Sequence, residues 1–186
     1  MKLVVGLGNP GHEYKDTRHN VGFQLLDYLA SKKGIAINKN KFNGVYGEVF
    51  IGGEKVILLK PLSYMNLSGS VVSKFVNFYK IALQDILIIQ DDLDMSFGKI
   101  KIVYNSSSGG HNGIKDIEKC LGSKEYARLK IGIANDKTMD TKDYVLGCFS
   151  QEEQNILMND YEKLINILDD FCFISLDKLM SKYNNK

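Results

Sequence analysis

The alternation of short apolar runs with segments of helical periodicity most constrains how this chain can fold. Four apolar runs have the length of a buried strand, at residues 2–7 (KLVVGL), 56–60 (VILLK), 85–90 (DILIIQ) and 128–134 (RLKIGIA). Between them, apolar residues recur at helical spacing, most clearly over residues 20–33 and 71–79. Strands that alternate with helices are typical of an α/β protein with a mostly parallel sheet.

Further patterns complete this architecture. Residues 44–60 alternate around Gly52-Gly53 and predict a β-hairpin, and residues 98–104 predict another strand. More helices are expected over residues 114–122, from about residue 151, and over about 175–183. No repeat, linker or compositional break divides the chain. We therefore expect a single domain over residues 1–186, a three-layer α/β/α sandwich around a central mixed, mostly parallel sheet.

The composition is ordinary for a globular protein outside the membrane. Hydrophobic residues make up 44% and charged residues 25% of the 186 residues, and no apolar stretch approaches the ~20 residues that span a bilayer. The chain starts without the pattern of a secretory signal, so we expect a cytoplasmic protein. The net charge of +2 is too small to indicate nucleic acid binding by itself, and Arg18 and Arg128 are the only arginines.

The three cysteines, Cys120, Cys148 and Cys172, are odd in number and form no C-x-x-C pair. This spacing indicates neither a zinc site nor a disulfide framework. We expect three reduced thiols that mostly pack as small apolar groups.

Three glycines near the start, Gly6, Gly8 and Gly11, fit the G-x-G-x-x-G spacing of a dinucleotide-binding turn. That interpretation requires a helix that opens at the glycines, whereas the next helical pattern begins only near Asn20. The strand with a terminal acidic residue that should follow about 20 residues later is also missing. We expect instead that Gly6 and Gly8 let the backbone turn sharply and bring Asn9 to the edge of a site.

Polar side chains follow several of the predicted strands. They are Asn9 after the first strand, Tyr64 and Asn66 after residues 56–60, Asp91 after residues 85–90, and His111 and Asn112 after residues 98–104. Ligands bind beyond the carboxyl ends of the strands in α/β sheets. We therefore expect these side chains, together with His19, to share one site, since a carboxylate, two histidines and three amides can provide acid–base chemistry.

Each of these residues also has a purely structural interpretation. Asn66 or Ser68 could cap the helix that carries the apolar residues from Val71 to Tyr79, and Asn112 could cap the helix that it precedes. His111 lies in a glycine-rich loop and could bond only to backbone. Only the placement of these residues together at strand ends favours a functional site.

A metal site is an alternative for His19, Asp91 and His111, because histidine and carboxylate are common ligands. Their wide separation along the chain provides no helical ligand motif, and we expect no metal. The chain also lacks G-x-S-x-G and G-x-x-x-x-G-K-[ST], which disfavours a serine hydrolase of that type and a P-loop.

Six motifs follow one another along the chain: GLGNPGHEYKDTRHNVGF (6–23), KPLSYMNLSG (60–69), DDLD (91–94), GGHNGIKDI (109–117), LKIGIA (129–134) and YVLG (144–147). In these motifs the chain resembles the bacterial peptidyl-tRNA hydrolases over nearly its whole length. The resemblance implies hydrolysis of the ester that joins a peptide, or an N-blocked amino acid, to the 3′ end of tRNA. It implies recycling of tRNA from prematurely released peptidyl-tRNA, with neither cofactor nor metal.

The resemblance also implies roles for individual residues. His19 would be the general base that activates water, Asp91 would orient it, and Asn9 would distinguish blocked from unblocked aminoacyl-tRNA. Contacts with the substrate or tRNA are implied for Tyr14, Tyr64, Asn66, Asn112 and His111, and with the 5′ phosphate region of tRNA for Lys99 and Lys101. The chemistry agrees, since an imidazole with a pKa near ~6.5 can accept a proton from water at neutral pH.

Several positions depart from the usual pattern of the family. Gln90 stands where histidine is frequent, and Tyr64 replaces a frequent phenylalanine. The second basic position of the phosphate contact is Val103, for which Lys99 could compensate, and Lys130 stands where arginine is common. A lysine carries the charge but lacks bidentate geometry. Alternatively, Lys99 and Lys101 lie on a strand face that is exposed to solvent and contact no phosphate.

Two other functions remain open at this point. Some relatives on the fold bind RNA without useful hydrolysis, although the retained His19, Asp91, Asn9 and Asn112 disfavour that function here. An esterase for small acyl substrates would need no lysines that contact phosphate, and its activity would not depend on salt. We expect a monomer, because no oligomerisation pattern stands out.

Overall fold

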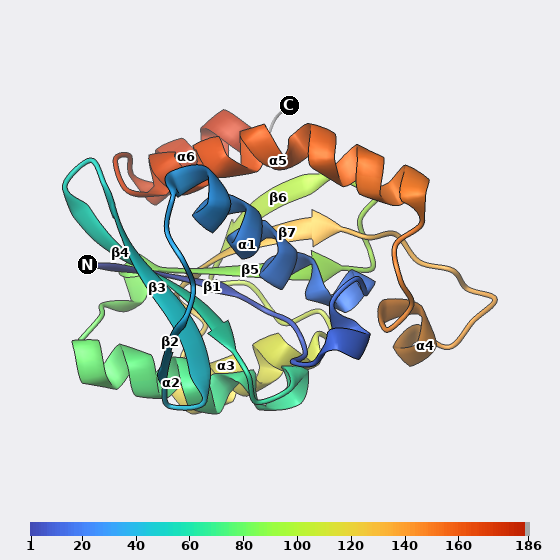
Figure 1. Cartoon of the computed structure of the whole chain (residues 1–186), viewed down its shortest axis with the longest axis horizontal. Coiled ribbons are helices and arrows are strands. Elements are labelled where there is room, and N and C mark those ends of the chain that lie inside the picture. Colours follow the sequence, from blue (N-terminus) through green and yellow to red (C-terminus); the bar gives the residue numbers. More distant parts are fainter. Residues whose placement is uncertain (185–186) are drawn as a thin grey trace.

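The structure, a computed structural model, describes residues 1–184. Its seven strands form one sheet in the order β2-β3-β4-β1-β5-β7-β6 (Figure 1). The strands are β1 (Lys2–Gly6), β2 (Lys39–Lys41), β3 (Gly44–Ile51), β4 (Glu54–Pro61), β5 (Ile86–Asp92), β6 (Ile100–Tyr104) and β7 (Ala127–Gly132). The α-helices are α1 (Val21–Lys33), α2 (Ser68–Tyr79), α3 (Asn112–Leu121), α4 (Thr141–Val145), α5 (Gln151–Phe171) and α6 (Leu176–Asn184).

The centre of the sheet is parallel and its edges are antiparallel. β1 pairs in parallel with β4 and β5, and β5 pairs in parallel with β7. The pairs β2–β3, β3–β4 and β6–β7 are antiparallel. The four central strands are buried on both faces, which explains why their sequences are continuous apolar runs without alternation. The expected mixed sheet with a parallel centre is confirmed.

Helices cover both faces of the sheet and enclose two hydrophobic cores. One core packs α1, α5 and α6 against the sheet, with Leu26, Leu164 and Leu179 fully buried. The other packs α2 and α3 against the opposite face, around Phe75 and Ile117. Figure 1 shows α5 and α6 along one side of the sheet and α2 and α3 along the other. The three-layer arrangement predicted from the sequence is therefore confirmed.

The starts of two helices differ from the sequence expectation. α2 follows a 3-10 turn, Met65–Leu67, and no side chain accepts a hydrogen bond at its N-cap, so capping by Asn66 or Ser68 is wrong. The Ser68 hydroxyl instead donates to the carbonyl of Met65 at 2.8 Å. α3 begins at Asn112 and is capped by the side chain of His111, so the structural alternative of an N-cap at Asn112 is also wrong. Both asparagine side chains are thereby left for other contacts.

The cysteines and the hydropathy of the helices can be compared with the expectations from composition. All three cysteines are free, but Cys120 and Cys148 are exposed and only Cys172 is half-buried, so the expectation that they mostly pack as apolar groups is wrong. Cys120 lies on the outer face of α3, and Cys148 lies in the loop after α4. Within residues 1–184, none of the helices combines the length and hydropathy needed to cross a membrane.

The glycines of the opening motif allow close packing rather than a sharp turn. Neither Gly6 nor Gly8 has a positive φ, so the turn expected there is wrong. A Cβ on Gly6 would collide with the carbonyl oxygen of Gly22 in α1, and a Cβ on Gly22 would lie 2.7 Å from the carbonyl oxygen of Ile89. The glycines thus let α1 approach β1 and β5 closely. α1 begins only at Val21, so no α-helix opens at the glycines themselves, as a dinucleotide-binding turn would require.

This packing predicts that Gly22→Ala destabilises the fold, although alanine normally favours a helix interior over glycine by about 1 kcal/mol. The added methyl group meets backbone atoms that cannot rotate away, and we expect a loss of about 3 kcal/mol or more in the free energy of unfolding. Urea denaturation measures it. Ser31→Ala, at an exposed position of the same helix, is the matched control and should be nearly neutral. Equal stability of the two variants would contradict the packing argument.

Candidate active site

The carboxyl ends of the central strands open into a cavity of about 910 Å³. Seven of the ten predicted site residues line it: Asn9, His19, Asn66, Asp91, Lys101, His111 and Asn112. Tyr14, Tyr64 and Lys99 are not among the lining residues. The crossover connections of the parallel strands bring these distant segments to one edge of the sheet, as the sequence predicted.

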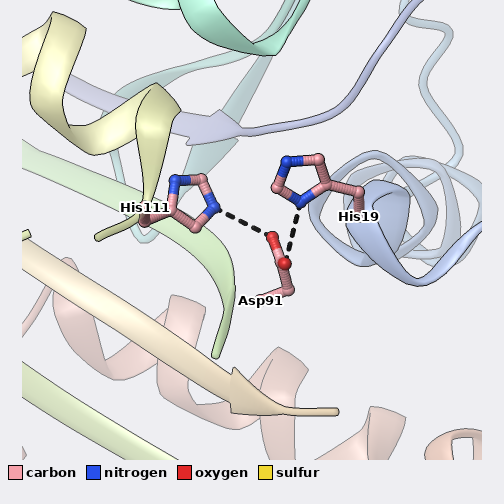
Figure 2. Close-up of side chains that lie close together, drawn as sticks. All are labelled: His19, Asp91 and His111. Atoms are coloured by element: carbon pink, nitrogen blue, oxygen red, sulfur yellow. Dashed lines mark hydrogen bonds and ion pairs between the residues drawn. The ribbon is translucent and has the colours of Figure 1, made fainter. Parts of the chain in front are cut away.

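A buried carboxylate joins the two histidines of the site. Asp91, near the carboxyl end of β5, is only 2% exposed. Its Oδ2 lies 2.8 Å from Nδ1 of His19, which is carried by a 3-10 turn, Arg18–Asn20, just before α1. Its Oδ1 lies 2.9 Å from Nε2 of His111, at the N-cap of α3. Figure 2 shows the two imidazoles on either side of the carboxylate.

The hydrogen bonds fix which ring nitrogens carry protons. Nδ1 of His111 accepts the backbone N–H of Ile114 at 3.3 Å, so in the neutral ring the proton is on Nε2 and is donated to Asp91. The carboxylate can only accept from His19, so Nδ1 of His19 carries a proton. Nε2 of His19 is then the nitrogen with a free lone pair, in the orientation that a general base requires.

The shared carboxylate also shifts the protonation of the site. Burial lowers the pKa of His19, but the charge of Asp91 and the hydrogen bond to it outweigh burial and raise the pKa above 6.5. For Asp91, burial raises the pKa, but the two histidines outweigh it and hold the pKa well below its ordinary value. The contact between the Asp91 carboxylate and the His19 imidazolium stabilises the fold. This stabilisation is lost as pH falls through the lowered pKa of Asp91, and it is also lost as pH rises through the raised pKa of His19.

The same three side chains were the candidate ligands for a metal. One ligand atom from each lies within 4.8 Å of the others. A metal-bound histidine normally donates its other ring N–H to an acceptor, whereas Nδ1 of His111 receives a hydrogen bond from a backbone N–H. Nε2 of His111 therefore carries a proton and offers no lone pair. The donor set fits a hydrogen-bonded His–Asp–His arrangement better than a metal site.

Asn9 is held by an asparagine that the sequence analysis did not single out. Asn20 is 1% exposed, and its side-chain oxygen accepts the backbone N–H of Asn9 at 2.8 Å, while its amide donates to the carbonyl of Asn9 at 2.9 Å. The side-chain oxygen of Asn9 accepts the backbone N–H of Met65 at 2.7 Å. That contact fixes the orientation of the amide and leaves Nδ2 of Asn9 as a donor on the cavity side. The position of Asn20 directly after His19 was the only sequence signal for this role.

Asn66 and Asn112 are exposed and stand between two depressions. Both line the main cavity, and both also line a smaller one of about 370 Å³. The smaller depression continues along α3 past Lys115 and Lys119. The two amides can therefore reach groups of a ligand that extends out of the main cavity.

The two predicted tyrosines lie beside each other outside the cavity lining. Their ring centroids are 6.4 Å apart with an interplanar angle of 87°, an edge-to-face contact. Tyr64 is 52% exposed and has φ 64° and ψ 158°, a combination that is essentially restricted to glycine. This strained residue directly precedes Met65, whose N–H fixes the amide of Asn9. The strain at Tyr64 is thus linked to the orientation of Asn9.

The basic residues are arranged differently from the sequence expectation. Lys101 lines the cavity, but Lys99 is exposed and does not. Lys130 also lines the cavity and is the direct cross-strand partner of Lys101 in the β6–β7 pair. Residues directly opposite in an antiparallel pair project from the same face of the sheet. Lys101 therefore has Lys130, rather than Lys99, as its neighbour in the cavity, and Lys130 forms an ion pair with Asp92 at 2.7 Å.

Arg18 connects the turn that carries His19 to the far wall of the cavity. Its Nη1 donates to the carbonyl of Tyr144 in α4 at 3.1 Å, and its Nη2 pairs with Glu153 of α5 at 3.1 Å. Its guanidinium also lies 4.3 Å from the centroid of the Tyr144 ring. Thr141 and Val145 of α4 line the cavity. Arg18 therefore holds α4 next to the site, a function that the sequence analysis did not assign.

The fold and the site together define an α/β protein with a hydrogen-bonded His–Asp–His centre in a cavity at the carboxyl ends of its parallel strands. A model of the peptidyl-tRNA hydrolase family matches residues 3–186, and the chain belongs to this family. It is 47% identical over 185 residues to a peptidyl-tRNA hydrolase of Lactobacillus acidophilus, with 99% of this chain and 100% of the relative covered. It is 46% identical over 186 residues to that of Bacillus cytotoxicus, with both chains fully covered. A crystal structure of the peptidyl-tRNA hydrolase from Acinetobacter baumannii matches with a TM-score of 0.92 at 37% identity, covering 100% of this chain and 95% of the other.

The raised pKa of His19 is open to a direct test. In Asp91→Asn the charge and the carboxylate hydrogen bond are lost while burial remains, so we expect the pKa of His19 to fall below 6.5. An NMR titration of the imidazole signals measures it, and the exposed His12 provides a reference signal in the same spectra. An unchanged pKa of His19 in the variant would show that Asp91 does not control its protonation.

Proposed function

We propose that this chain hydrolyses the ester bond between the peptide and the 3′ end of tRNA in peptidyl-tRNA. The observation that carries the proposal is the orientation of His19, whose Nδ1 is held by a buried carboxylate while Nε2 is free in the cavity. Membership of the peptidyl-tRNA hydrolase family supports the choice of substrate. An ester of a ribose hydroxyl can be cleaved by base-activated water, which is the chemistry that this site can provide.

The reaction needs one water molecule and one proton acceptor. His19 Nε2 takes a proton from water while the water oxygen bonds to the ester carbonyl carbon. Asp91 stabilises the imidazolium that forms and keeps the ring oriented. When the tetrahedral intermediate collapses, the bond between the carbonyl carbon and the ribose oxygen breaks. The imidazolium returns the proton to that oxygen, and a peptide carboxylic acid and a tRNA hydroxyl leave.

The asparagines are placed to bind the peptide side of the substrate. Nδ2 of Asn9 is a fixed donor that can stabilise the developing oxyanion or bind a peptide carbonyl. Asn66 and Asn112 are exposed at the wall between the two depressions and can bind further amide groups. An unblocked aminoacyl ester would place an ammonium group where an amide is expected, and its mismatch with these groups would favour N-blocked substrates.

The other features of the proposal stay predictions from the sequence and the family. We propose that the enzyme is monomeric and cytoplasmic, needs no metal or cofactor, and recycles tRNA from prematurely released peptidyl-tRNA. The tautomer of His111 supports the expectation that no metal is needed. Its protonated Nε2 has no lone pair for a metal, so only two of the three candidate ligands remain.

The first test compares release of an N-acetylated amino acid and of a free amino acid from the same tRNA. We expect selective release of the acetylated form, and a loss of about 10²-fold or more in kcat for His19→Ala, since a general base contributes about 10²–10⁴-fold. Affinity for tRNA should change little. If the unaltered chain binds tRNA but releases nothing, RNA binding without hydrolysis replaces this proposal. Near-normal turnover by the variant would remove His19 as the base.

A second test concerns the phosphate contact, which we propose to lie at Lys101 and Lys130. Each lysine that neutralises a phosphate contributes to the salt dependence of binding, so Lys101→Ala and Lys130→Ala should each lower its slope by about 1. Filter binding of tRNA at several salt concentrations measures the slope. Lys99→Ala is the matched control, because Lys99 lies outside the cavity lining, and its slope should be unchanged. A lower slope in Lys99→Ala alone would contradict the assignment.

A further inference from the structure

Arg128 is a buried cation behind the active site. It lies on β7 and is 1% exposed, and within residues 1–184 it forms no ion pair with a carboxylate. Its Nη1 donates to the side-chain oxygen of Gln90 at 2.6 Å, and its Nη2 donates to the backbone carbonyl of Ser107 at 2.7 Å. Burial of a guanidinium without a counter-ion opposes folding, and an apolar side chain would fill such a position at lower cost. The position therefore requires another explanation.

Gln90 links this cation to the catalytic strand. It is 2% exposed and directly precedes Asp91 on β5. Its side-chain amide donates to the backbone carbonyl of Asp91 at 3.1 Å, while its oxygen accepts from Arg128. Both ends of the side chain are thus fixed.

Ser107 links the cation to the loop that carries His111. Residues 105–110 of this loop are exposed or only half-buried. Gly109 and Gly110 have φ values of 59° and 87°, and no atom lies within 4 Å of a Cβ placed on either. The loop therefore has little packing of its own to fix its path. The contact from Arg128 lies four residues before His111, and the N–H of His111 bonds to the carbonyl of Ser108 at 3.1 Å.

We propose that Arg128 and Gln90 are positioning residues that fix the loop at Ser107, so that His111 reaches the carboxylate of Asp91. The planar guanidinium binds two acceptors that belong to different segments, one on β5 and one in the loop. A lysine at this position would carry the same charge but could not hold both acceptors in one plane. The inference rests on the proposed function, because it assigns Arg128 to the catalytic site through His111.

The geometry predicts what happens to His19 when the loop is released. His111 donates an N–H to one oxygen of Asp91 and stabilises its negative charge. Without that donor the charge acts on His19 alone, so the imidazolium of His19 is stabilised further. The pKa of His19 should then rise further above its ordinary value.

The experiment is a double-variant cycle with Arg128→Lys and His111→Asn. Asparagine is a good N-cap, so His111→Asn preserves the start of α3 while removing the reach to Asp91. We expect each variant to raise the pKa of His19 in an NMR titration and to lower kcat/KM by about 10-fold. The double variant should be little worse than either single variant, because both remove the same contact.

Three measurements separate this proposal from a structural role. If the kcat/KM losses of the two single variants multiply in the double variant, Arg128 only supports the fold. An unchanged pKa of His19 in Arg128→Lys would show the same. Urea denaturation checks that the variants fold. If Arg128→Lys fails to fold, Gln90→Met replaces it, because this variant removes the acceptor that holds Arg128 to β5. The NMR titration needs no substrate, so its outcome is independent of whether the chain cleaves peptidyl-tRNA.

Discussion

The buried carboxylate of Asp91 is the group on which the chemistry of this structure depends. A lone carboxylate at this depth would be protonated or would oppose folding, and two imidazole N–H groups prevent both outcomes. The hydrogen bonds also set the state of each ring. His111 stays in one tautomer because it caps α3, and His19 presents its free nitrogen to the cavity. One buried charge thus sets the geometry and the proton affinity of the candidate base.

Buried polar contacts connect the segments around this carboxylate to one another. Asn20 holds both backbone groups of Asn9, and the amide of Asn9 in turn binds the backbone of Met65. Arg128 connects β5 to the loop before His111. Directional hydrogen bonds specify orientation, whereas apolar contacts tolerate rotation. This explains why buried amides and a buried guanidinium are concentrated next to the cavity.

The departures from the expected basic positions follow from strand pairing. Along one strand, Lys99 and Lys101 look like a pair, but β6 begins at Ile100 and only Lys101 reaches the cavity. The direct partner of Lys101 lies across the sheet, at Lys130. The sequence contained both lysines without indicating that they face each other, because the register of β6 and β7 depends on the whole sheet.

The sequence by itself determined the architecture and the chemical components of the site. Apolar runs without alternation specified buried central strands, and polar residues after those runs specified where a site would form. Tertiary structure decided the rest. The packing role of Gly6, the cap at His111 and the partners of Asn20 and Arg128 all depend on segments that are far apart in the chain. Local patterns encode periodicity, but hydrogen-bond partners are chosen only when distant backbone and side-chain groups are buried together.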